Sequence, residues 1–179
     1  MANVQTAIAF VLALEDDHQH PGCITQLRGD SGGRTRLGIA SRFHPELAAQ
    51  GFFEGDPIPG SSNPLRWAPT TIDLAAAADL AADLSRREYA NPLLINQIAD
   101  QDLANRMLGF GVNEGVHQAA VLLQRCLPGI VADGILGPLT IARINALDAA
   151  DILAAQFNFA GMQSRAQRHV HLSSGGAEG

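Results

Sequence analysis

The sequence is poor in charge and especially in basic residues. Charged residues make up 17% of its 179 residues, and 18 acidic side chains outnumber 12 basic ones, for a net charge of −6. Such a surplus of negative charge repels the phosphates of nucleic acids. With 46% apolar residues, the chain can still build a compact core. We therefore expect a folded protein that does not bind nucleic acid. A monomer is also expected.

Long apolar runs are also missing. The longest one near the N-terminus, residues 6–14, is shorter than the roughly 20 residues of a membrane-spanning helix. The segment has neither a basic leader nor a small-residue cleavage site, so it does not read as a signal peptide. We expect a protein that is made in the cytoplasm and does not insert into a membrane.

Only two cysteines are present, Cys23 and Cys126. They lack the paired spacing of a metal site and permit at most one disulfide, so free thiols are expected. Asp17, His18, His20 and Cys23 are all of metal-ligand type, but no second group follows at a recognised spacing. The sequence predicts no metal and no cofactor.

Glu15 is the most informative single residue. Four apolar residues recur before it at helical spacing: Val4, Ile8, Val11 and Leu12. Glu15 continues this stripe, so we expect it to point inward at the end of a helix. Desolvation and the negative end of the helix dipole both raise a carboxyl pKa, which suits a general acid. The alternative is that Glu15 only begins a solvated acidic run.

A glycine-rich segment follows. Asp30 precedes Gly32 and Gly33, which can adopt the positive φ angles of a tight hairpin, and Thr35 comes next. Such a hairpin holds Asp30 and Thr35 close together, where they can position and deprotonate a water opposite Glu15. Two carboxylates flanking one bond are the arrangement that glycoside hydrolysis requires. In the alternative, Asp30 only caps its own loop in an Asx turn.

These residues resemble glycoside hydrolase family 108, the bacterial and phage muramidases with a C-terminal peptidoglycan-binding-like segment. The family has a helix ending in Glu, here Glu15, followed by Asp-x-Gly-Gly-x-Thr-x-x-Gly-Ile. That second element is matched by Asp30, Gly32, Gly33, Thr35, Gly38 and Ile39. Later elements are matched by Ala104, Phe110, Val112, Asn113 and Gly115, by Leu123 and Gln124, and by Asp133, Gly134, Gly137, Pro138 and Thr140.

The chain departs from the family pattern at several points. Glu15-Asp16-Asp17 stands where the family has Glu-Gly-Gly, and the stretch that follows is longer. Tyr89-Ala90 stands where Tyr-Trp is usual, so one aromatic surface for sugar is absent.

The resemblance implies a mainly α, lysozyme-like domain over residues 1–172, with a small β-hairpin near residues 23–40. Residues 115–172 are its peptidoglycan-binding-like helical part, and residues 173–179 are expected to be a disordered tail.

Local patterns predict further elements. The many prolines and glycines of residues 44–69 indicate a long irregular excursion. Its aromatic residues Phe52, Phe53 and Trp67 either stack against substrate or hold the excursion on the core. Thr70 and Asp73 resemble the capping box of an alanine-rich helix that ends near Tyr89.

Helices are also expected near residues 98–109 and 115–127, separated by a glycine-rich kink. Asn113 in this kink either contacts sugar or caps the helix. The tight turn at residues 133–138 is explained by structure alone or by carbohydrate binding. A last helix is expected over residues 149–170, with Ile152, Leu153, Phe157 and Phe159 facing inward.

The function implied is that of an N-acetylmuramidase cutting the β-1,4 bond between N-acetylmuramic acid and N-acetylglucosamine. Glu15 protonates the leaving oxygen, Asp30 activates the water or stabilises the oxocarbenium charge, and Thr35 fixes the water. A lytic transglycosylase using Glu15 alone and a non-catalytic wall-binding or adaptor protein are the alternatives.

Gly33, Tyr89 and Asn113 are the expected substrate-binding residues. The partners implied are peptidoglycan glycan strands, with an immunity protein or secretion machinery as further candidates. An endolysin or bacteriolytic effector of this kind acts on the periplasmic or extracellular wall, which it reaches by non-classical export or lysis.

Overall fold

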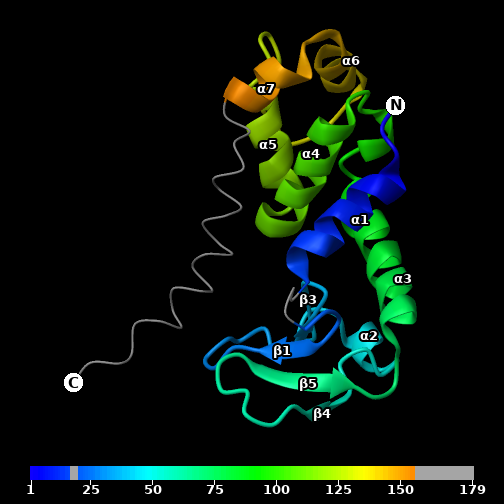
Figure 1. The fold of residues 1–179 in the computed structure, drawn as a ribbon. Coiled ribbons are helices and arrows are strands. Elements are labelled where there is room, and N and C mark those ends of the chain that lie inside the picture. Colours follow the sequence, from blue (N-terminus) through cyan, green and yellow to red (C-terminus); the bar gives the residue numbers. More distant parts are fainter. Residues whose placement is uncertain (17–19, 156–179) are drawn as a thin grey trace, which may run out of the picture. The chain divides into compact units, whose positions relative to one another are not determined.

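A computed structural model describes residues 1–16 and 20–155 of the protein. The described residues form seven α-helices, two short helical turns and one five-stranded antiparallel sheet (Figure 1). They divide into two compact units, a sheet unit (Leu12–Leu84) and a helical unit (Met1–Val11 together with the chain from Ser85). The predicted mainly α, lysozyme-like fold with a small hairpin near residues 23–40 is confirmed. No helix within the described part combines the length and apolar character that a membrane crossing requires.

The sheet unit contains all five strands, in the spatial order β3-β2-β1-β5-β4. Their bounds are Ile24–Gln26 for β1, Thr35–Arg36 for β2, Ile39–Ala40 for β3, Gly55–Pro57 for β4 and Leu65–Pro69 for β5. The prediction of an irregular excursion over residues 44–69 is wrong, since this segment holds α2 (Pro45–Ala48), β4 and β5. β5 becomes a strand because it pairs along all of β1, a partner about 40 residues earlier in the chain that no local pattern reveals.

The core of the sheet unit forms between one face of the sheet and α3 (Leu74–Ser85). Ile24 and Phe52 are completely buried, and Phe53 packs edge-on against Phe52 with ring centroids 4.9 Å apart. Ala77 and Ala81 of α3 belong to the same cluster as these two phenylalanines. Burial of one such phenylalanine contributes about 1.5–3 kcal/mol. Of the two roles considered for these phenylalanines, the structure shows the packing role.

Asp73 begins α3, because its carboxylate accepts a hydrogen bond from Ala76 N at 2.8 Å. The helix continues through a single π-helical turn, Arg86–Ala90, which lies in the helical unit. The expected end near Tyr89 is therefore close to the observed one.

The helical unit contains α4 (Gln101–Glu114), α5 (Val116–Arg125), α6 (Pro138–Ala146), α7 (Ala149–Ala155) and the 3₁₀ turn Ile95–Gln97. The N-terminal part of α1 (Val4–Glu15) also belongs to it, and Ala2 N donates to Ile98 O at 2.7 Å. Pro138 occupies the first turn of α6.

The predicted kink at Gly109 and Gly111 is wrong, because α4 continues through both to Glu114. A Cβ on Gly111 would lie 2.5 Å from Leu93 Cδ1, so this glycine allows close packing instead of a bend. The chain turns at Gly115, whose φ is 88°.

α7 begins at residue 149, where the last helix was expected, and Ile152 is buried. The remainder of that expected helix, with Phe157 and Phe159, and the expected tail lie outside the described residues.

Candidate active site

Glu15 ends α1 beside the turn that joins β2 to β3 in the sheet unit. This two-residue turn, Leu37–Gly38, has φ angles of 51° and 78°, the signs required by a type I′ hairpin. A Cβ on Gly38 would lie 2.8 Å from Glu15 Cβ and 3.3 Å from its Oε2. Gly38 thus leaves room for the half-buried side chain of Glu15.

The expectation of a tight hairpin turn at Gly32 and Gly33 is wrong, because the two-residue turn lies at Leu37–Gly38. Only Gly33 of this pair has a positive φ, 80°. β1 and β2 pair through Thr25 and Thr35, which leaves a loop between them that is too long for a two-residue turn. A Cβ on Gly33 would lie 2.7 Å from Ser41 Oγ, so the close contact at this glycine is internal. Its binding of substrate stays a prediction.

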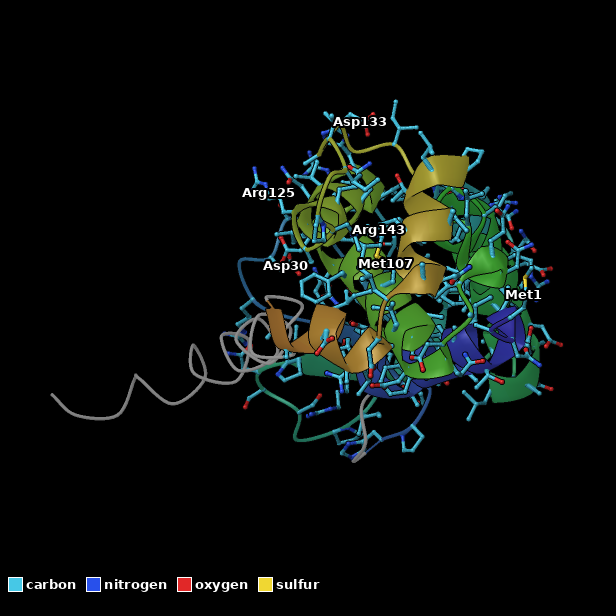
Figure 2. The ribbon with its side chains drawn as sticks, turned by 90° about the horizontal axis from the view of Figure 1, so that it is seen from above. Met1, Asp30, Met107, Arg125, Asp133 and Arg143 are labelled. Atoms are coloured by element: carbon cyan, nitrogen blue, oxygen red, sulfur yellow. The ribbon has the colours of Figure 1, made fainter. Side chains whose placement is uncertain are left out.

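Asp30 lies exposed on the loop between β1 and β2 (Figure 2). Its Oδ1 accepts a hydrogen bond from Gly32 N at 2.9 Å, so the Asx turn considered from the sequence is present. No hydrogen bond among the described residues involves its other carboxylate oxygen, Oδ2. The Asx turn therefore orients this carboxylate and leaves Oδ2 available to a water or a substrate.

Thr35 is the first residue of β2, between Thr25 on β1 and Ala40 on β3. It is half-buried, and its carbonyl oxygen accepts from Thr25 Oγ1 at 3.4 Å. The strand that starts at Thr35 leads directly into the turn against Glu15. The sheet unit therefore contains all three expected catalytic residues, on α1, the β1–β2 loop and β2.

Asp16 has a structural role that the sequence did not indicate. Both oxygens of its carboxylate accept from Gly22 N, at 2.9 and 3.1 Å, which ties the end of α1 to the start of β1. An acidic residue in place of the family's glycine thus stabilises the chain entry to the sheet.

Arg36 was also missed, although it follows Thr35 directly. Its side chain is 1% exposed and donates to the carbonyl oxygens of Gly22, Phe52 and Ile72, at 2.9, 3.2 and 3.0 Å. Burial lowers the pKa of Arg36, and the negative charge of Asp16 opposes that shift. Sequence periodicity assigns charged residues to the exposed face of a strand. It therefore cannot detect a buried arginine that joins three segments of the chain.

Trp67 on β5 pairs with Ile24 and is half-buried. The guanidinium of Arg34 lies 4.4 Å from the centroid of its ring, a cation–π contact, and also donates to Phe53 O at 2.9 Å. One face of Trp67 is therefore already covered by protein.

Tyr89 and Asn113 both belong to the helical unit. Tyr89 is half-buried. Burial is the main cause that raises its pKa, and the negative charge of Glu88 adds to it, so the hydroxyl remains neutral. Asn113 Nδ2 donates to Gly109 O within α4 at 3.0 Å, and the helix cap is Gly115. Asn113 is therefore not the cap of α4. Contact of Tyr89 or Asn113 with substrate stays a prediction.

The loop after α5 is held by a buried glutamine, Gln124. Its Nε2 donates to Asp133 Oδ1 at 2.8 Å and to Ile135 O at 3.0 Å, and its Oε1 accepts from Gly134 N. Figure 2 shows Asp133 on this loop. These bonds account for the turn by structure alone.

Both cysteines are free thiols, as expected. Cys23 is buried. Burial raises the pKa of Cys126, so its thiol lacks the low pKa of a reactive cysteine. Of the acidic and histidine residues considered with Cys23 as ligands, Asp17 and His18 lie outside the described residues.

Comparison with known proteins shows the fold and the family of the chain. A structure described as that of Brucella abortus SagA matches over 98% of this chain and 98% of its own, with 20% identity and a TM-score of 0.55, which is a likeness of fold. No curated protein matches. The family model for glycosyl hydrolase 108 matches residues 17–115, more than half of the chain, and starts just after Glu15. The chain therefore belongs to the glycosyl hydrolase 108 family and is a lysozyme-like glycoside hydrolase.

Proposed function

We propose that this protein is an N-acetylmuramidase, which hydrolyses the β-1,4 bond between N-acetylmuramic acid and N-acetylglucosamine in peptidoglycan. Family membership supports a peptidoglycan-acting glycoside hydrolase. The observation that carries the choice of catalytic acid is the contact between Glu15 and Gly38, which places this carboxyl group against the turn that follows Thr35.

In this proposal Glu15 donates its proton to the glycosidic oxygen as the bond between that oxygen and the anomeric carbon breaks. A water adds to the anomeric carbon, and its proton passes to Asp30. Asp30 suits this task because its Oδ1 is held by Gly32 N. Thr35 orients the water from β2. The protein acts on the wall in the periplasm or outside the cell.

Glu15→Gln tests this function. The amide keeps the volume of the side chain and removes the transferable proton, so digestion of isolated sacculi should fall by about 10²-fold or more. Turbidity of the sacculi reports the rate, and the melting temperature, expected to be unchanged, reports the fold.

A folded Glu15→Gln protein that clears sacculi at the wild-type rate would remove Glu15 from the mechanism. A wild-type protein that binds sacculi and releases no fragments would support the non-catalytic adaptor function instead.

A further inference from the structure

Three polar residues form a row across the sheet. Thr25 on β1 pairs with Thr35 on β2 at one side and with Arg66 on β5 at the other. Residues directly opposite one another on antiparallel strands project from the same face of a sheet. Thr35, Thr25 and Arg66 therefore share a face, and we call them the Thr–Arg row.

Burial shows which face this is. Ile24, Arg36 and Ile39 occupy the alternate positions on β1, β2 and β3, and their exposed fractions are 0%, 1% and 8%. They form the core side of the sheet. All members of the Thr–Arg row are half-buried, so the row lies on the opposite, more accessible side.

The row extends the candidate site in one direction. Neighbouring strands are about 4.8 Å apart, which puts the backbone of Arg66 about 10 Å from that of Thr35. The guanidinium group of arginine matches a carboxylate with two parallel donors. In peptidoglycan, each N-acetylmuramic acid carries a peptide stem on its lactyl group, and these stems bear carboxylates.

We propose that Arg66 is a specificity-determining residue that binds a carboxylate of the peptide stem. This inference rests on the muramidase function proposed above. The stem runs over Thr25 toward β5 while the muramic acid ring lies beside Thr35. The enzyme then prefers glycan that carries stems over bare glycan.

A carboxylate on the same face supplies a second variant. Asp56 on β4 pairs with Ala68, two residues beyond Arg66, so it is a diagonal neighbour of Arg66 on this face, and it is exposed. Its charge opposes that of a bound stem. Asp56→Asn should therefore tighten binding of stem-bearing glycan, while loss of Arg66 weakens it.

The experiment compares two soluble substrates: glycan strands with intact stems and the same strands stripped of stems by an amidase. The release of reducing ends gives kcat and KM on each. Arg66→Gln should raise KM for the stem-bearing strands by about fivefold, the upper range for a partly exposed ion pair, with kcat unchanged. Both constants on stripped strands should stay as in the wild type.

Arg66→Lys keeps the charge and should retain part of the preference, and Asp56→Asn should lower KM only on stem-bearing strands. Arg87→Gln is the matched control, because the Arg87 side chain is 65% exposed and lies in the helical unit. Melting curves confirm that each variant is folded.

Equal changes on both substrates in folded Arg66→Gln, or no change on either, would overturn the proposed role of Arg66 and leave the muramidase function standing. A wild-type enzyme that releases no reducing ends from either substrate would overturn the muramidase function itself.

Discussion

Gly38 belongs to the candidate active site although it has no side chain, because it lies against Glu15. Its φ of 78° favours glycine, and a Cβ would lie 2.8 Å from Glu15 Cβ. Gly38→Ala should therefore displace Glu15, and a displacement of about 1 Å can cost about 10²-fold in rate. Turbidity assays on sacculi measure this loss.

Gly60→Ala is the control for backbone strain. Gly60 has nearly the same φ, 81°, and nothing within 4 Å of its Cβ position. Both variants should lose a similar 1–3 kcal/mol or so of stability from the strained backbone. Only Gly38→Ala should lose activity, and an equal loss in both variants would contradict the proposed contact.

Asp30→Asn separates the charge of Asp30 from its structural role. The amide oxygen can still accept from Gly32 N, so the Asx turn and the melting temperature should be preserved. Loss of the proposed base should slow digestion by about 10²-fold, with a smaller effect for Thr35→Ala.

Mass spectrometry of the released muropeptides identifies the reaction type at the same time. Hydrolysis leaves free reducing ends, whereas transglycosylation leaves anhydro ends that are lighter by one water. Mainly anhydro products and a nearly normal rate for Asp30→Asn would assign the enzyme as a lytic transglycosylase.

At the scale of the element, the turn after α5 contains two glycines with different requirements. Gly134 has a φ of 78° and its Cβ position overlaps the ring of His117, whereas Gly137 has a φ of −105° and an open Cβ position. Gly134→Ala should lower the stability by roughly 1–3 kcal/mol, and Gly137→Ala, at the N-cap of α6, by about 1 kcal/mol or less. Thermal melting measures both, and similar melting temperatures for the two variants would argue against this turn geometry.

The same turn should contribute to acid sensitivity. Hydrogen bonds from Ile135 N and then from Gln124 Nε2 lower the pKa of Asp133 below its usual 3.8. Because the pKa of Asp133 is lower in the folded than in the unfolded protein, its carboxylate stabilises the fold fully above pH 3.8. This stabilisation is lost as the pH falls through the pKa of the folded state. Urea unfolding should therefore show a weaker loss of stability below pH 3.8 in Asp133→Asn than in the wild type.

For the whole molecule, charge and function have to be reconciled. The net charge of −6 opposes attraction to an anionic wall. Local arginines on the sheet, such as Arg66, can still bind a carboxylate, because interactions between exposed charges are screened beyond about 8–10 Å in salt. The family match over residues 17–115 includes parts of both compact units. The single domain over residues 1–172 stays a prediction.

The sequence by itself determined the features that depend on local pattern. A helix ending in Glu15, a turn-rich segment from Asp30 to Ile39 and Pro138 at the start of α6 follow from periodicity, glycine and proline. These preferences act within a few residues, so they can be read without the fold. Motif order was also sufficient to recognise the family.

Tertiary structure decided what depends on distant partners. β5 is a strand because it pairs with β1, and β4 is a strand because it pairs with β5. The tight turn lies at Leu37–Gly38 because Thr35 pairs with both Thr25 and Ala40. Arg36 is buried because three carbonyl groups from separate segments meet its donors. Hydrogen bonds between residues far apart in the chain carry no local signature, so only the folded molecule reveals them.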